Sequence, residues 1–325
     1  MITERPRRNR KSAAIRAMVQ ETHVGVHDLM YPLFLLPDAQ AQIPIASMPG
    51  ISRMGLEVIK KEIEQCMQAG LQQFVIFPVV DEELKDQTAS YGCIDNNFYH
   101  QALRELKIAF PEACLMTDVA MDPYSSDGHD GLVREGKILN DETLEILGKM
   151  ALAQAKAGAD IVGPSDMMDG RVAYIRRVLD NHGFTEVSIM AYTAKYASCF
   201  YGPFRDALAS TPKFGDKLSY QMHPANRREA LREAELDVME GADFLMVKPA
   251  MAYLDIISDL KQHSHLPISA YNVSGEYSMI KASAMNGWID ERKAVLEVLT
   301  SIKRSGADII LSYFAKDFAL HYAEK

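Results

Sequence analysis

The sequence predicts a (β/α)8 barrel, and two regularities along the chain point to this fold. The first is a repeated junction in which a helix-like pattern ends at a glycine and a short apolar run follows, at residues 158–161, 241–244 and 306–309, with a looser version at 69–71. Because glycine commonly stands just past the end of a helix, each junction indicates a helix followed by a buried strand. Repetition of that unit is typical of a parallel sheet covered by helices.

The second regularity is the number of short apolar runs. Eight are found, at residues 31–35, 74–77, 115–119, 161–163, 188–191, 244–247, 268–271 and 309–311. Charged amphipathic stretches long enough for helices lie between them, for example at 57–69, 141–157, 226–240 and 291–305. Eight strands alternating with helices favour a closed barrel over an open doubly wound sheet. We therefore expect an N-terminal arm, residues 1–30, and a catalytic barrel, residues 31–325.

The chain has a formal net charge of -9, yet it begins with a strongly basic segment. The cations of this segment are Arg5, Arg7, Arg8, Arg10, Lys11 and Arg16. An acidic body is unsuited to nucleic acid, so we expect the arm to dock on an acidic neighbouring subunit of a homo-oligomer. The alternative is a nucleic-acid-binding tail.

We expect a cytoplasmic protein with no membrane partner. No apolar run approaches the roughly 20 residues of a membrane span, and no apolar segment follows the basic start as it would in a secretory signal. The four cysteines, Cys66, Cys93, Cys114 and Cys199, are scattered without a CxxC pair or the histidine spacing of a zinc site. We expect them to be reduced thiols.

Two lysines stand at the ends of predicted strands. Lys248 follows the apolar run 244–247, where burial would lower its pKa and free the amine to attack a carbonyl. Lys195 ends the neighbouring strand, so both ammonium groups would share a pocket and lower that pKa further. This pair suggests Schiff-base chemistry, although a lone strand-end lysine is more often a salt-bridge or phosphate-binding residue.

Longer motifs carry a family resemblance. MVKPAMAYLDI, AKYASCFYGPFRDA, PSDMMDGR, NVSGEYSMIKA and the arm RPRRNRKSAAIRAMVQE resemble the porphobilinogen synthase (5-aminolevulinate dehydratase) family, and the likeness runs from about Arg5 to the C-terminus. The resemblance implies a lyase of tetrapyrrole biosynthesis that condenses two 5-aminolevulinate molecules, with loss of two waters, through lysine Schiff bases. It also implies an extended arm and an allosteric, magnesium-tuned homo-octamer.

The resemblance also implies roles for individual residues. Lys248 matches the Schiff-base lysine of the A site and Lys195 the second lysine, in the P site. Arg205 and Lys217 match the cations that bind the P-site carboxylate, and Ser274 and Tyr313 match the A-site carboxylate ligands, with strand-end capping as the alternative. The other residues implied around the substrates are Asp118, Ser165, Tyr192, Phe204 and Gln221. Residues 203–221 match a lid that excludes water, the alternative being an ordinary surface loop.

The metal ligands depart from the zinc-dependent members of that family. Three cysteines of those members correspond here to Ala120, Asp122 and Asp130, and hard carboxylates suit magnesium better than a closed zinc site. We expect magnesium near Asp122 and Asp130 and do not expect zinc, although Asp127 and His129 leave a carboxylate and imidazole zinc site open. Glu233 matches an allosteric magnesium ligand at a subunit interface; taken alone it reads as part of a solvated helix face.

Two rival functions are weighed against this reading. An aldolase-type Schiff-base barrel needs only one lysine together with glycine-rich phosphate loops after the seventh and eighth strands, and such loops are absent from the sequence. An inactive barrel kept as an interaction protein predicts loss of a catalytic lysine, whereas both lysines are present.

Overall fold

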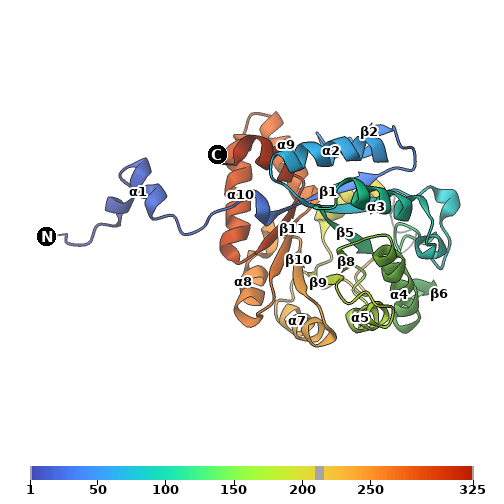
Figure 1. Cartoon of the computed structure of the whole chain (residues 1–325). Helices are drawn as coiled ribbons and strands as arrows, with labels where there is room; N and C mark the ends of the chain where they lie inside the picture. The colour runs from blue at the N-terminus through green and yellow to red at the C-terminus, as the bar shows by residue number, and fades with distance from the viewer. Residues whose placement is uncertain (1, 209–215, 324–325) are drawn as a thin grey trace.

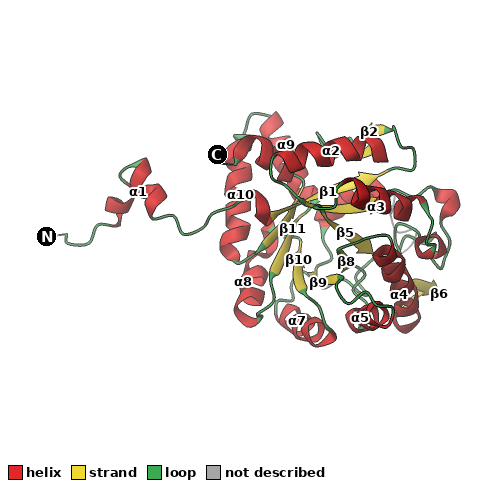
Figure 2. Cartoon of the chain, viewed as in Figure 1, coloured by secondary structure: helices red, strands yellow, loops and turns green. Residues whose placement is uncertain are grey.

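A closed barrel of eight parallel strands forms the centre of the computed structural model, which describes residues 2–208 and 216–323 (Figures 1 and 2). The strands are β1 (Leu29–Leu35), β4 (Gln73–Pro78), β5 (Cys114–Val119), β8 (Ile161–Pro164), β9 (Ser188–Lys195), β10 (Phe244–Lys248), β11 (Ile268–Asn272) and β12 (Ile309–Ser312). Each pairs in parallel with the next, and β12 pairs with β1 to close the ring. The predicted (β/α)8 barrel is therefore confirmed, with every strand at its expected place.

Helices surround the strands on the outside of the barrel (Figure 2). They are α2 (Leu56–Gln68), α3 (Phe98–Ala109), α4 (Asn140–Lys156), α5 (Arg171–Asn181), α7 (Arg228–Glu240), α8 (Leu254–His263), α9 (Ser274–Met285) and α10 (Glu291–Ser305). The glycine junctions act as expected: Gly241 ends α7 with φ 99°, a left-handed conformation that costs glycine little. The sequence periodicity thus located helix and strand correctly.

Short strands at the ends of the barrel were not predicted. The antiparallel pair β2 (Gln42–Pro44) and β3 (Ser52–Met54) extends the sheet beside the end of β1, and β6 (Leu132–Arg134) and β7 (Lys137–Leu139) form a hairpin after β5. Each has only three residues, too few to show the apolar run or the alternation by which a strand is found in a sequence. Both pairs border the end of the barrel at which its strands finish.

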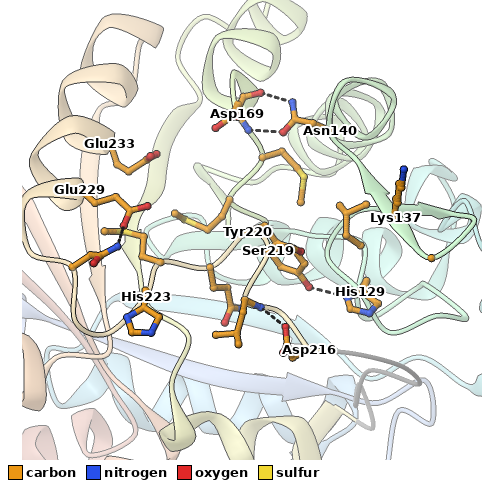
Figure 3. A pocket seen from close by; sticks show the side chains of 18 residues that line it. His129, Lys137, Asn140, Asp169, Asp216, Ser219, Tyr220, His223, Glu229 and Glu233 are labelled. Carbon is orange, nitrogen blue, oxygen red and sulfur yellow. Dashed lines mark hydrogen bonds between the residues drawn. The ribbon is translucent and has the colours of Figure 1, made fainter.

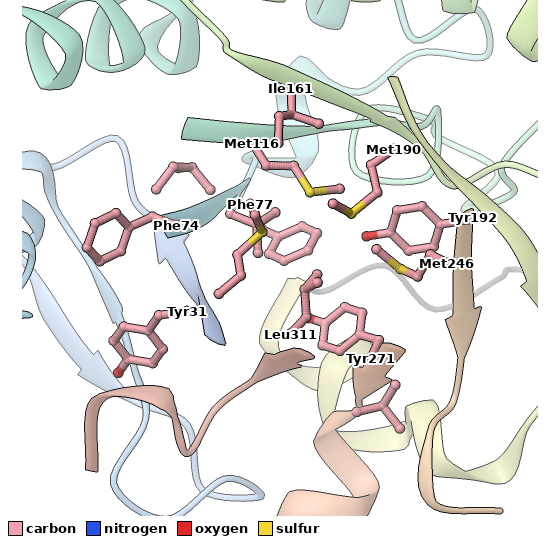
Figure 4. Close-up of a cluster of buried hydrophobic side chains, with 14 of the residues drawn as sticks. Tyr31, Phe74, Phe77, Met116, Ile161, Met190, Tyr192, Met246, Tyr271 and Leu311 are labelled. Carbon is pink, nitrogen blue, oxygen red and sulfur yellow. The ribbon is translucent and has the colours of Figure 1, made fainter. Parts of the chain in front are cut away.

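The barrel interior is filled by side chains. Met116, Met190, Met246 and Leu311 are fully buried in the cluster drawn in Figure 4, together with aromatic rings such as Phe74. Flexible methionine side chains suit an irregular space of this kind. The interior is thus a packed core. Residues that can contact a ligand are expected at the carboxyl ends of the strands.

The N-terminal arm extends away from the barrel (Figure 1). It contains a 3-10 turn, η1 (Pro6–Arg10), and a short helix, α1 (Ala13–Met18), and neither has a buried residue. The arm joins the barrel through Asp28, whose carboxylate lies 2.8 Å from the Lys303 ammonium. Among the described helices, none combines the length and the apolarity needed to cross a bilayer.

Candidate active site

Lys195 and Lys248 lie side by side at the carboxyl ends of β9 and β10. Their Cα atoms are register partners in the parallel pair, and both side chains are almost completely buried. Adjacent strands hold them, so the spacing of the two amines is fixed by backbone hydrogen bonds and not by a loop. The structure thus brings together the two lysines that the sequence singled out.

Aromatic rings surround the Lys248 amine. Its Nζ lies 5.1 Å from the ring centre of Tyr192, 5.2 Å from Tyr201, 5.0 Å from Phe204 and 4.6 Å from Tyr271. Burial, reinforced by the charge of Lys195, lowers the pKa of Lys248 from 10.5 to about 7. A large fraction of this lysine is therefore a neutral, nucleophilic amine near neutral pH.

Lys195 faces the acidic residues that follow β5 and β8. Its Nζ donates a hydrogen bond to the backbone carbonyl of Ser165 and lies 3.9 Å from Asp130 Oδ2. Asp118 lies close by: burial, and then the charge of Asp122, raises its pKa to about 7, and its Oδ1 has no hydrogen-bond partner among the described residues. A carboxyl group with such a pKa can exchange a proton near neutral pH.

Lys217 occupies the space between the two aspartates expected to bind a metal. Its Nζ lies 2.9 Å from Asp130 Oδ2 and 3.2 Å from Asp122 Oδ2, and all three side chains are buried. Burial raises the pKa of Asp130, but Lys195 and Lys217 outweigh it and hold that pKa at about 2. In this arrangement Lys217 neutralises carboxylates of its own chain, and its predicted contact with a substrate carboxylate would require it to leave them.

These residues do not fit a divalent ion as they are arranged here. A lysine ammonium already supplies the positive charge between Asp122 and Asp130, and the described part of the chain holds no group of three or more His, Cys, Asp or Glu that could bind a metal. His129, the possible zinc ligand, places its Nδ1 3.1 Å from the hydroxyl of Tyr220. The active-site magnesium near Asp122 and Asp130 therefore stays a prediction that requires Lys217 to move.

On the other side of Lys248 lie the residues expected to bind the A-site carboxylate. Tyr313, directly after β12, is buried, and its hydroxyl lies 2.9 Å from that of Tyr271. Ser274 begins α9, and its Oγ accepts a hydrogen bond of 2.9 Å from the amide of Phe204. Ser274 follows β11, the neighbour of β10, and Tyr313 follows β12, the next strand along. Both hydroxyls can therefore present neutral donors to one end of a substrate whose other end reaches Lys248.

The predicted lid, residues 203–221, is described in part, since residues 209–215 lie outside the described structure. Its first portion is α6 (Gly202–Leu208), which carries Phe204 and half-buried Arg205. Arg53 of β3 holds α6 through hydrogen bonds to the carbonyls of Asp206 and Ala207, at 2.6 and 2.7 Å. Helix α6 therefore lies beside the Lys248 pocket, and Phe204 forms part of the pocket wall.

The last portion of that segment runs beside Lys195. The amide of Met222 donates to the Lys195 carbonyl at 3.0 Å, and the neighbouring Gln221 is buried, with its Oε1 lacking a partner among the described residues. An unpartnered amide oxygen at this depth is costly unless a ligand or water contacts it. Gln221 is thus placed where a polar substrate group near Lys195 could reach it.

Glu233 lies apart from both lysines, in a cavity of about 870 Å³ (Figure 3). Glu229 stands one helical turn earlier on α7, and Asp169 and His223 also line the cavity. Burial, and then the neighbouring carboxylates Asp237, Asp169 and Glu229, raise the pKa of Glu233, against the opposing effect of Arg171. The cavity is acidic and roomy, which suits a cation that keeps most of its water shell.

Sequence reasoning missed several residues of the site. Tyr201 and Tyr271 form two walls of the Lys248 pocket, and Glu276 accepts hydrogen bonds from the loop that follows Lys248. Tyr271 lies within an apolar strand and Glu276 within a helix, where each reads as an ordinary core or cap residue. Only their position next to Lys248 distinguishes them.

Comparison with known proteins shows the family of this chain. The family model described as delta-aminolevulinic acid dehydratase matches residues 3–321. A chloroplastic enzyme of that name from Physcomitrium patens is 56% identical over 96% of this chain and 72% of its own length, and the one from Bacillus subtilis is 50% identical over 98% of both. The crystal structure of the Toxoplasma gondii enzyme, in complex with its reaction product porphobilinogen, superposes with a TM-score of 0.96 at 53% identity, covering 98% of this chain and 91% of that one. The chain therefore belongs to the delta-aminolevulinic acid dehydratase family.

Proposed function

We propose that this chain is a lyase that condenses two molecules of 5-aminolevulinate to porphobilinogen, with loss of two waters, using Lys248 and Lys195. The observation that carries the proposal is the register pairing of these lysines in a buried pocket, where the pKa of Lys248 is lowered to about 7. An aldolase-type barrel would need only one such lysine. Family membership over nearly the whole chain points to the same reaction.

Lys248 performs the first step that the geometry supports. Its neutral amine adds to the C4 ketone of one substrate, and loss of water from the resulting carbinolamine gives an imine. Asp118, whose pKa is about 7, can deliver the proton that the departing hydroxyl needs. The hydroxyls of Ser274 and Tyr313 bind the carboxylate at the other end of the same molecule.

Lys195 forms the corresponding imine with the second substrate. Gln221 is buried next to the segment that pairs with Lys195. We propose that Gln221 and Arg205 bind the second carboxylate together with Lys217, once that lysine leaves Asp122 and Asp130. Holding two substrates on adjacent strands turns a bimolecular condensation into a reaction between neighbours, which is a large part of the expected rate gain. The Tyr192 ring lies near both amines, 5.8 Å from Lys195 Nζ and 5.1 Å from Lys248 Nζ, so it forms a wall shared by the two parts of the pocket.

Replacing Lys248 tests the proposal directly. Lys248→Ala should lose at least about 1000-fold in kcat, because it removes the group that forms the covalent intermediate. Borohydride reduction in the presence of 5-aminolevulinate should mark Lys248 in the wild-type protein, as seen by peptide mass. Lys261→Ala, which removes a surface ion pair with Asp308, serves as control and should keep activity. Substantial porphobilinogen formation by Lys248→Ala would refute the assignment.

We further propose that magnesium supports this activity from the cavity around Glu233. The Glu233 carboxylate would hold the ion, which would keep most of its waters, and Glu229 and Asp169 would add negative charge to the cavity without binding the ion directly. Dialysis against a zinc-selective chelator should leave activity intact, whereas stronger chelation should lower it until magnesium is restored. Rescue by zinc alone would contradict the proposal and favour a site that uses Asp127 and His129.

The assembly and the compartment are proposals of the same kind. We propose a cytoplasmic homo-octamer in which the arm of each subunit docks on an acidic neighbour. The arm supports this, since it is basic and exposed and has no buried residue in η1 or α1. Plant relatives bear the word chloroplastic in their names, so fractionation of cells of the source organism is the test of location.

A further inference from the structure

Glu276 is a buried carboxylate that joins the elements carrying the A-site residues. It lies in the first turn of α9 with no exposed surface. Its carboxylate accepts hydrogen bonds from the Met251 amide at 2.7 Å, the Asn272 side-chain amide at 3.0 Å and the Val273 amide at 3.0 Å. Met251 belongs to the loop that follows Lys248, so this carboxylate ties that loop to the end of β11.

The hydrogen-bonded network continues to β12. The Ser312 hydroxyl donates to Asn272 Oδ1 at 2.9 Å, and the Phe314 amide donates to Ser312 Oγ at 3.2 Å. Ser312 and Phe314 flank Tyr313, and Val273 precedes Ser274. One chain of hydrogen bonds across three neighbouring strands therefore connects positions close in sequence to Lys248, Ser274 and Tyr313.

Burying a carboxylate at this depth costs desolvation free energy. Burial raises the pKa of Glu276 to about 7, although the hydrogen bonds it accepts lower it. Transfer of such a group from water is unfavourable unless it is fully hydrogen-bonded, and a neutral side chain could cap α9 at less cost. In return, Glu276 joins two separate segments rigidly, because one oxygen accepts a hydrogen bond from the Met251 amide and the other from the Val273 amide.

We propose that Glu276 is a positioning residue that, through Asn272 and Ser312, fixes the separation between the Lys248 amine and the hydroxyls of Ser274 and Tyr313, and so selects the length of the keto acid bound between them. This inference rests on the proposed function, because it takes these three residues to bind one substrate. A 4-oxo acid such as 5-aminolevulinate has two methylenes between carboxylate and ketone, and a 5-oxo acid has three. A rigid separation accommodates the first and rejects the second.

Borohydride trapping with two probes measures this selection. The probes are 4-oxopentanoate and 5-oxohexanoate, and the adduct at Lys248 is quantified by peptide mass. Wild-type protein should prefer the shorter acid by roughly 10–200-fold, the range that one methylene allows. In Glu276→Gln the amide nitrogen faces backbone donors, so the network breaks and the preference should fall at least tenfold, with Ser312→Ala showing a smaller fall.

Asp308→Asn provides the matched control. Asp308 also joins β11 and β12, accepting a 2.8 Å hydrogen bond from the Ile268 amide, but at the amino ends of these strands. This variant should keep the wild-type preference. Two results with a Glu276→Gln protein that melts cooperatively would overturn the inference. One is an unchanged preference for the shorter acid, and the other is an equal proportional loss of both adducts.

Two further outcomes keep the test decisive. If Glu276→Gln does not fold, Ser312→Ala carries the test, and an unchanged preference in that variant overturns the inference. If wild-type protein forms no adduct at Lys248 with 5-aminolevulinate or with either probe, the proposed function itself fails. The two failures are therefore distinguishable.

Discussion

The Lys248 amine is subject to opposing effects on its proton affinity. The four aromatic rings within 5.2 Å favour the ammonium form by cation–π attraction, which is worth roughly 0.5–2 kcal/mol for a ring. Burial and the charge of Lys195 favour the neutral amine and prevail, since they bring the pKa to about 7. The pocket therefore holds a nucleophile at neutral pH and still stabilises the cationic imine that forms from it.

The pH dependence of trapping follows from this balance. The rate of imine trapping at Lys248 with 4-oxopentanoate should rise with pH through a midpoint near 7, whereas an ordinary lysine would require a pH above 10. Lys195→Met removes the neighbouring positive charge, so the pKa of Lys248 should increase and the midpoint should move up by about one unit. The measurement is the trapping rate as a function of pH.

Asp118→Asn should shift the pH midpoint of trapping in the direction opposite to that of Lys195→Met. The Asp118 carboxylate raises the pKa of Lys248, so its neutralisation should move the midpoint to lower pH. Opposite shifts in the two variants separate an electrostatic effect from general damage to the pocket. Shifts of the same sign would contradict this account of how the amine is activated.

At the scale of secondary structure, α9 packs closely on the segment before α6, next to the Lys248 pocket. Gly275 makes this contact possible: a Cβ there would lie 2.5 Å from the Phe200 carbonyl oxygen and 2.7 Å from its Cα. The close approach lets the Phe204 amide reach the Ser274 hydroxyl. Thus a single missing side chain determines how closely the segment carrying Arg205 can pack on the barrel.

Gly275→Ala should therefore displace α6. Since a shift of about 1 Å near reacting groups can cost on the order of 100-fold, kcat/KM should fall 10–100-fold. Overpacking should destabilise the fold by only about 1–3 kcal/mol. Steady-state kinetics and a thermal melt measure the two effects.

Gly202→Ala is the matched control for that variant. Gly202 begins α6 with φ -51°, and a Cβ there would meet no heavy atom within 4 Å. This variant should keep wild-type kinetics. Equal losses in both variants would show that α6 is merely sensitive to substitution, and that the approach at Gly275 is not decisive.

At the scale of the whole molecule, the arm and the acidic cavity are the features without a role inside one subunit. The arm extends away from the barrel (Figure 1), its cations are exposed, and Met18 is 78% exposed. The cavity gathers Glu229, Glu233 and Asp169 without a described lysine or arginine in its lining other than Lys137. Both features agree with the proposed assembly tuned by magnesium.

Removing residues 2–10 should therefore give smaller species, because the arm loses most of its cations. Glu233→Ala should shift the size distribution and abolish activation by magnesium while leaving trapping at Lys248 intact, since Glu233 lies apart from the lysines. Light scattering at several magnesium concentrations measures the first effect and kinetics the second.

Glu235→Ala is the control for Glu233→Ala. Glu235 is exposed on the same helix and does not line the cavity, so its loss should change neither assembly nor activation. A wild-type protein that is a fully active monomer at every dilution, with or without magnesium, would show that the arm and Glu233 have other roles.

The sequence alone determined the barrel and the position of both lysines. Strand and helix follow from local periodicity, and a polar residue directly after an apolar strand must lie at the carboxyl end of a barrel. Lys195 and Lys248 are placed by this rule, and their register confirms it. The short polar strands β2, β3, β6 and β7 escaped prediction because three residues carry too little pattern.

The tertiary structure alone decided which side chains meet across long separations in the sequence. Lys217 pairs with Asp122 and Asp130, about 90 residues away, and the rings around Lys248 come from β9, from the stretch that leads into and begins α6, and from β11. Glu276 reaches the Lys248 loop only because β10 and β11 are neighbours. No local pattern encodes these contacts, because closure of the barrel creates them. The same closure creates the burial and the charge balance that lower the pKa of Lys248 to about 7.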